Sequence, residues 1–165
     1  MTEPAIRTWQ PVVAAAATAF AAGVLGALVT DLGPWYYHLR KPSWQPPDWL
    51  FGPAWTLIFA QAAGSGILGW RTAPNRATQI WVVTLFMFNI VLNITWSGLF
   101  FRLQRPDWAL IEVVFLWSSI AALIWSLWPR SRNASLLLVP YLVWVTFASI
   151  LNLAIVQLNA PFGGH

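Results

Sequence analysis

Polar side chains inside an otherwise apolar stretch are the first places where this sequence could do chemistry. The segment FNIVLNITWSGLFF at 88–101 places Asn89 and Asn93 four residues apart, with Trp96 three residues further on. In a helix, residues at this spacing share one face. An amide in hydrocarbon must find a hydrogen bond. The pair therefore either joins neighbouring helices or forms the polar part of a binding pocket, and the spacing leaves both interpretations open.

Tryptophan is the most unusual component, with 13 among 165 residues. Several indoles fall near the ends of apolar stretches, where such rings anchor a protein at the membrane interface: Trp9, Trp35, Trp44, Trp49, Trp70, Trp108 and Trp128. Five others lie deeper: Trp55, Trp96, Trp117, Trp125 and Trp144. A deep indole buries a large flat surface and carries one N–H that needs a partner. Packing or lipid contact explains any single ring, whereas several together suggest a cavity for a flat aromatic ligand.

Two further segments carry polar groups at helical spacing. In VPYLVWVTFASILN, residues Trp144, Ala148 and Asn152 follow i, i+4, i+8, so they could face the same interior as the asparagine pair. Glu112 is the one acid within the apolar stretches. An intramembrane acid is a functional candidate. Glu112 nevertheless lies one turn inside Trp108, where it could reach water or a loop arginine, and we favour a structural role.

Other kinds of site are excluded by composition. Cysteine is absent, and both histidines, His38 and His165, fall outside the apolar stretches. We therefore expect no metal site and no required cofactor. Phosphate-binding glycine loops, nucleophile elbows and paired intramembrane carboxylates are also missing from the sequence, so no catalytic residues are assigned. The net charge is only +4, and the basic residues stand singly or in pairs. This pattern is typical of membrane-surface loops and does not indicate nucleic-acid binding.

The elements that must position these residues are apolar helices. Apolar residues make up 58% of the chain and charged residues 8%, so its natural solvent is lipid. About 20 apolar residues cross a bilayer as a helix. Such stretches occur at about 11–30, 50–70, 78–101, 108–128 and 134–158. The first stretch could be a signal peptide, but it is longer than the usual apolar region of one. We therefore predict an all-α membrane protein with one domain, residues 1–165, and five transmembrane helices.

The connections between these helices set the predicted topology. Those at 71–77, 102–107 and 129–133 are short, which favours an up-down bundle. Segment 31–49, rich in Pro, Trp and Tyr, should form no regular helix, and we predict an ordered loop lying over one mouth of the bundle. Loop cations divide five to four between the two sides, so the orientation stays open.

Several sequence blocks closely resemble the tryptophan-rich sensory protein / translocator protein (TspO/MBR) family, bacterial type. They are WYYHLRKPSWQPPDWLFGPAW at 35–55, FNIVLNITWSGLFF at 88–101, WALIEVVFLW at 108–117 and VPYLVWVTFASILN at 139–152. They occur in the family's order, and K-P-x-W-x-P-P is a highly specific element. The resemblance covers nearly the whole chain after the first apolar stretch.

The resemblance implies a function. Family members are five-helix membrane proteins, commonly homodimers, that bind porphyrins and other hydrophobic molecules in a pocket closed by the first loop. The expected ligand is protoporphyrin IX or a related tetrapyrrole. The expected role is that of a translocator or sensory regulator in the bacterial cell envelope. Some relatives degrade bound porphyrin in light with tryptophan involved, so Trp55 and Trp144 are the candidates for such chemistry.

Carried over block by block, the resemblance also implies a binding site. It places Trp55, Asn89, Asn93, Trp144 and Ala148 in the pocket. The predicted ligand-binding set adds three further indoles, those of Trp96, Trp35 and Trp44.

Sterol binding, known among mitochondrial relatives, is a further alternative. In sterol-binding relatives the last helix continues into Tyr and then Arg, and here Leu153 and Gln157 stand in those places. The loop does fit the loose sterol pattern through Leu32, Tyr36 and Arg40, but such matches are weak. The sequence therefore favours porphyrin over sterol.

Overall fold

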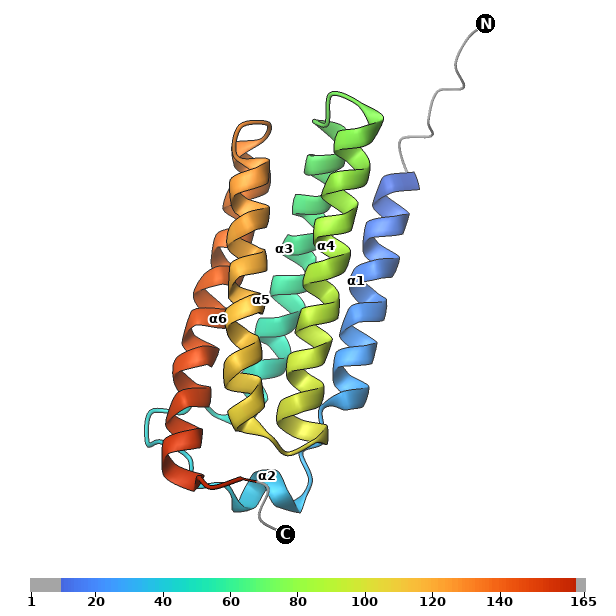
Figure 1. Cartoon of the computed structure of the whole chain (residues 1–165). Helices are drawn as coiled ribbons and strands as arrows, with labels where there is room; N and C mark the ends of the chain where they lie inside the picture. The colour runs from blue at the N-terminus through green and yellow to red at the C-terminus, as the bar shows by residue number, and fades with distance from the viewer. Residues whose placement is uncertain (1–9, 163–165) are drawn as a thin grey trace, which may run out of the picture.

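The computed structural model describes residues 10–162, which form a bundle of helices (Figure 1). The long helices are α1 (Gln10–Val29), α3 (Phe51–Arg71), α4 (Arg76–Ser97), α5 (Pro106–Leu127) and α6 (Arg132–Asn159). A short helix α2 (Pro34–His38) and a 3₁₀ turn η1 (Asp48–Leu50) lie between α1 and α3, and a π-helical turn η2 (Gly98–Arg102) extends α4. The long helices alternate in direction, as the short connections predicted, and no strand occurs within the described range.

Each predicted apolar stretch is helical, except that Thr30 and Trp128 lie just beyond the ends of their helices. Four of the described helical segments are long and apolar enough to cross a membrane. These segments are α1, α4 with η2, α5 and α6. The helix α3 has 21 residues but is less apolar, because it contains four glycines and the polar pair Gln61 and Ser65. The structure therefore supports a multi-helix membrane protein, and the crossing by α3 stays a prediction.

The core lies where α5 packs on α6 and on α4. Leu116, Ile120, Leu123 and Leu127 form a fully buried stripe along α5. In α1, by contrast, Ala22 is the one buried residue. Large apolar side chains such as that of Leu28 are exposed on its outer face. Helices that are apolar all round suit a bundle whose outer surface meets lipid.

The helices begin where the sequence supplies caps. Asn75 accepts a hydrogen bond from the Thr78 N–H at the start of α4, and Ser131 does the same for Ala134 at the start of α6. These side chains satisfy backbone donors that the first turn leaves free. At α5 the first residue is Pro106, whose missing N–H has no cost at that position.

The prediction that segment 31–49 contains no regular helix is wrong in part. Residues Pro34–His38 form the short helix α2, which crosses the end of the bundle in Figure 1. The reason is that Pro34 occupies the first helical position, where its fixed φ favours helix instead of breaking it. The rest of the segment, apart from η1, has no regular structure.

Candidate functional site

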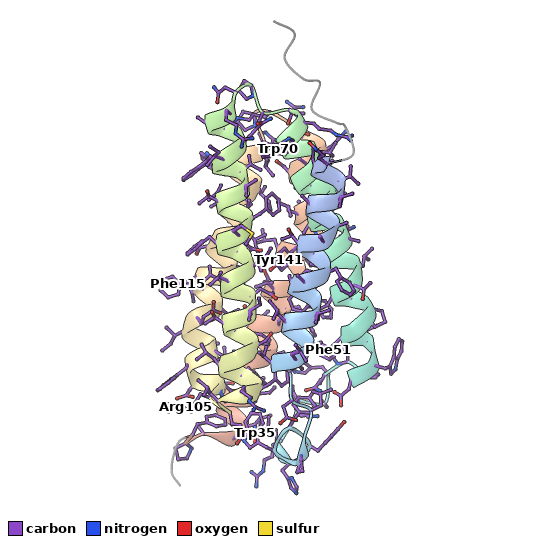
Figure 2. All side chains as sticks on the ribbon, turned by 90° about the vertical axis from the view of Figure 1, so that its right-hand side faces the viewer. Trp35, Phe51, Trp70, Arg105, Phe115 and Tyr141 are labelled. Carbon is purple, nitrogen blue, oxygen red and sulfur yellow. The ribbon has the colours of Figure 1, made fainter. Side chains whose placement is uncertain are left out.

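A cavity of about 690 Å³ lies at the end of the bundle covered by segment 31–49. We call it the loop-covered cavity. Its walls come from α1, α3, α4 with η2, α6 and the loop, and its size falls within the range of about 300–1,000 Å³ usual for ligand pockets. Most of its large side chains are aromatic: Phe51, Trp55, Phe59, Trp96, Phe100, Phe101 and Trp144. Figure 2 shows Phe51 at this end of the bundle, with Trp35 beyond it.

Five of the eight predicted ligand-binding residues line this cavity: Trp55, Asn93, Trp96, Trp144 and Ala148. Their rings form two aromatic groups. The Trp55 ring meets Trp144 edge-on at a centroid distance of 6.4 Å, and Trp96 stacks on Phe100 at 5.3 Å. Such contacts hold large flat side chains in defined orientations.

Two of these indoles have unused hydrogen-bonding capacity. The Nε1 atoms of Trp96 and Trp144 are buried, and neither finds an acceptor among the described residues. A buried N–H without a partner costs about 1–3 kcal/mol. Both residues line the cavity, but these two nitrogen atoms are closed off from it, so the surface that the cavity offers a ligand is chiefly aromatic.

The asparagine pair joins three helices. The Asn89 side-chain amide donates to Ser119 Oγ at 2.8 Å, and that of Asn93 donates to the Tyr141 hydroxyl at 3.2 Å. Both asparagines are buried, with exposed fractions of 4% and 5%. For Asn93 the two interpretations left open by the sequence coexist, because its side chain bridges helices and also lines the loop-covered cavity. Asn89 lies outside this cavity and lines a different one.

Trp35 and Trp44 do not line the cavity. Trp35 meets Phe100 edge-on at 6.2 Å, and Trp44 meets Phe147 edge-on at 6.0 Å. Their rings therefore hold the loop against η2 and α6 and contribute no surface to the cavity.

The other two deep tryptophans point away from the interior. Trp117 is 40% exposed and its indole N–H donates to Thr146 Oγ1 on the neighbouring helix, while Trp125 is 83% exposed. Position along an apolar stretch gave the depth of these rings but not the face of the helix on which they lie.

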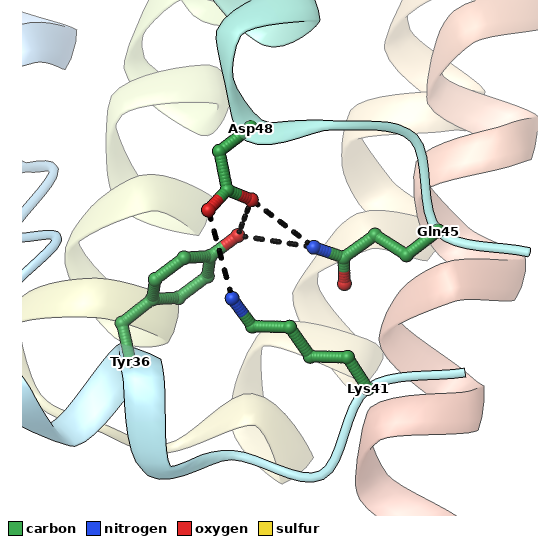
Figure 3. A network of polar contacts seen from close by, with 4 residues as sticks. All are labelled: Tyr36, Lys41, Gln45 and Asp48. Atoms are coloured by element: carbon green, nitrogen blue, oxygen red, sulfur yellow. Dashed lines mark hydrogen bonds and ion pairs between the residues drawn. The ribbon is translucent and has the colours of Figure 1, made fainter. Parts of the chain in front are cut away.

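A polar network inside the loop closes one side of the cavity (Figure 3). The Tyr36 hydroxyl donates to the Asp48 carboxylate at 2.8 Å, and Gln45 Nε2 donates to the same carboxylate at 3.2 Å. Lys41 Nζ lies 3.7 Å from Asp48 and 3.6 Å from the centre of the Tyr36 ring. Burial and the neighbouring carboxylate raise the pKa of Tyr36, so its hydroxyl remains a donor.

Sequence reasoning did not identify this network, although Tyr36, Gln45 and Asp48 all line the cavity. The available signal was an aromatic hydroxyl followed by an amide and an acid in a proline-rich loop. Prolines reduce the conformational freedom of such a loop before it folds. Its polar groups can therefore meet at a low entropic cost.

A second contact fixes the loop to the opposite end of the chain. The Arg40 N–H donates to Asn159 Oδ1, and Asn159 Nδ2 donates to the Arg40 carbonyl, both at 2.8 Å. This paired contact attaches segment 31–49 to the last residue of α6. The loop is therefore tied to the bundle by polar as well as aromatic contacts.

Glu112 does not make the contact with a loop arginine that its sequence position allowed. It is buried, with 8% exposed, and neither carboxyl oxygen has a hydrogen-bond partner among residues 10–162. The nearby loop cation Arg105 instead pairs with Asp107. Glu112 does not line the loop-covered cavity, so its unpaired carboxyl is no part of this site.

Comparison with known proteins gives a consistent result. The sequence profile of the TspO/MBR family matches residues 14–158. The tryptophan-rich protein TspO of Chlorobaculum tepidum is 44% identical over 143 residues, covering 84% of this chain and 89% of the relative. The protein of the same name from Archaeoglobus fulgidus is 38% identical over 150 residues, covering 90% and 96%. The human translocator protein is 32% identical over 131 residues, covering 79% and 78%. The chain therefore belongs to the TspO/MBR family.

Proposed function

We propose that this multi-pass membrane protein binds a tetrapyrrole such as protoporphyrin IX in the loop-covered cavity and acts as a translocator or sensory regulator. The observation that carries the proposal is the cavity itself, with its size and its aromatic walls. A flat macrocycle offers ring faces to these aromatic walls. Relatives named translocator protein and tryptophan-rich sensory protein support the role.

The proposal includes five membrane crossings, with α3 as the fifth. At about 1.5 Å per residue, the 21 residues of α3 extend about 31 Å, close to the bilayer's hydrocarbon thickness of about 30 Å. Its neighbours α1 and α6 are both apolar enough to span. Five crossings place the start of α1 and the end of α6 on opposite sides, as they lie in Figure 1.

Assembly as a homodimer in a bacterial cell envelope is part of the same proposal. It rests on the family's usual assembly and on the bacterial relatives that the chain matches. Sterol is the weaker ligand candidate, because Leu153 and Gln157 are exposed on α6, outside the cavity.

A titration of the purified full-length protein with protoporphyrin IX in darkness, followed by tryptophan fluorescence, tests the ligand. Trp55→Ala removes a cavity wall and should weaken binding about five- to thirtyfold, the equivalent of one or two kcal/mol. Trp125→Ala is the matched control, because this ring is 83% exposed on the outer surface. Equal affinity for both folded variants and the wild type would remove the loop-covered cavity from the proposal.

Light-driven breakdown of the bound tetrapyrrole is a second candidate function, favoured by the edge contact between Trp55 and Trp144 inside the cavity. An indole there could give one electron to the photoexcited macrocycle, with dioxygen as the oxidant that the later ring opening consumes. Trp55→Phe and Trp144→Phe keep a flat ring at each position, so binding should survive while product formation under illumination slows. Wild-type rates in both variants would exclude these indoles as donors.

A further inference from the structure

A second cavity, of about 460 Å³, lies between α1, α3 and α4. We call it the small-residue cavity, because small side chains form most of its middle: Ala15, Ala22, Ala62, Ala63 and Gly66. It extends to the end of the bundle away from the loop, where Trp70 lies in Figure 2. The binding proposal made above does not use it.

The two cavities are neighbours with a shared partition. Ala19, Phe59 and Asn93 line both, whereas the other lining residues belong to one cavity or the other. At this partition the side-chain amide of Asn93 donates to Tyr141, and that of nearby Asn89 donates to Ser119. The amide donors at the inner end are therefore already engaged within the protein.

The opposite end of the small-residue cavity carries a charge. Arg76 is its one formally charged lining residue among those described, and the guanidinium lies 5.5 Å from the centre of the Trp70 ring. No carboxylate of residues 10–162 forms an ion pair with Arg76. The cavity thus has a cation at its mouth and a long apolar interior.

We propose that the small-residue cavity binds a single-chain amphiphile with an acidic head group, such as a long-chain fatty acid. The head group pairs with Arg76, and the chain lies between α1, α3 and α4. The alanine and glycine in its lining leave an apolar space that suits a hydrocarbon chain, and fewer aromatic side chains line it than line the loop-covered cavity. Charge complementarity at the mouth selects an anion. This inference does not depend on tetrapyrrole binding.

The charge is tested with a fatty acid that carries a photoreactive diazirine near its tail, added to the full-length protein in zwitterionic nanodiscs above the pKa of the acid. Arg76→Gln should reduce labelling about threefold to tenfold, as loss of a partly exposed charge pairing would. Arg132→Gln is the matched control. Arg132 lies over Trp128 at 5.6 Å, also at the end away from the loop, but it lines neither cavity. The uncharged methyl ester should label wild type and Arg76→Gln equally.

The position of the chain is tested with a pair of glycine variants. A Cβ at Gly66 would make ordinary contacts of 3.8–4.0 Å with Phe86, and a Cβ at Gly26 would meet nothing within 4 Å. Gly66→Leu should therefore fill the small-residue cavity and block labelling. Gly26→Leu enters the loop-covered cavity and should leave labelling unchanged.

Peptide mapping should place the label on the inner turns of α1, α3 or α4 that face the small-residue cavity. The proposal is overturned if Arg76→Gln and Arg132→Gln label to the same extent. It is also overturned if Arg76→Gln reduces labelling by the methyl ester as much as labelling by the acid. Label on the walls of the loop-covered cavity would overturn it as well.

Discussion

Removing one hydroxyl from the loop tests whether segment 31–49 acts as a lid on the bound ligand. Tyr36→Phe deletes the donor to Asp48 and an acceptor for Gln45, while the ring keeps its contacts with Phe101 and Lys41. A hydrogen bond to a charged group contributes about 1.5–3 kcal/mol. Asp48 keeps its contacts with Gln45 and Lys41 and is partly exposed. We therefore expect a loss of roughly 1–2 kcal/mol in lid closure.

A loss of this size should appear in the rate at which ligand leaves. If the lid must open before release, protoporphyrin should dissociate about five- to thirtyfold faster from Tyr36→Phe than from wild type. Stopped-flow fluorescence in darkness measures this rate. Tyr37→Phe is the matched control, because this neighbouring tyrosine is exposed and its hydroxyl makes no hydrogen bond within the described structure. Equal rates for wild type and Tyr36→Phe would refute the lid.

The pH dependence of the lid follows from the pKa of Tyr36, which lies above its ordinary value of 10.0. The closed loop therefore holds the hydroxyl proton more tightly than the open loop does. The stabilisation of the closed loop by the protonated hydroxyl is fully present below the ordinary pKa and is lost as the pH rises above it. Titration of Tyr36 should therefore not accelerate ligand release between neutral pH and about pH 9.

Two further variants test the remaining contacts. Asn159→Ala removes both hydrogen bonds to the Arg40 backbone, so the rate of protease cleavage within 31–49 should rise severalfold. The control Asn133→Ala, at the far end of α6, should leave the cleavage rate unchanged. Equal cleavage rates for the two variants would mean that the Arg40–Asn159 contact does not hold the loop. Glu112→Gln replaces a buried carboxyl that has no described partner. The free energy of unfolding in detergent should therefore stay level or rise by about 1 kcal/mol. A marked fall would show that the carboxyl has a partner.

The sequence predicted the helices well because one physical requirement dominates them. Lipid demands long apolar stretches with satisfied backbone groups, and caps such as Asn75 and Ser131 mark where helices begin. Because the surface that faces lipid and the surface that faces the core are both apolar, the sequence does not indicate which face of a helix points inward. Trp117 and Trp144 lie at similar depths in equally apolar segments, yet of the two only Trp144 lines either of the cavities described above.

Site residues were predictable where polarity or a motif singled them out. Asn93 is an amide in hydrocarbon, which must have a partner, and Trp55 follows a specific proline-rich element. The Tyr36–Asp48 contact and the Arg40–Asn159 contact could not be predicted. The first forms when the loop folds on itself, and the second joins the loop to α6 across 119 positions.

The lower hydropathy of α3 has a physical reason in the architecture. This helix supplies Trp55 to the loop-covered cavity and Ala63 and Gly66 to the small-residue cavity. It also packs on α1, α4 and α6.

Close packing explains one glycine of α3, Gly69. A Cβ at Gly69 would lie 2.7 Å from the Leu127 side chain, so only glycine fits there without a shift of that buried residue. The glycines of α3, together with Gln61 and Ser65, lower its mean hydropathy. The segment that composition marks least clearly as a span thus lines both proposed binding sites, as α1 and α4 also do.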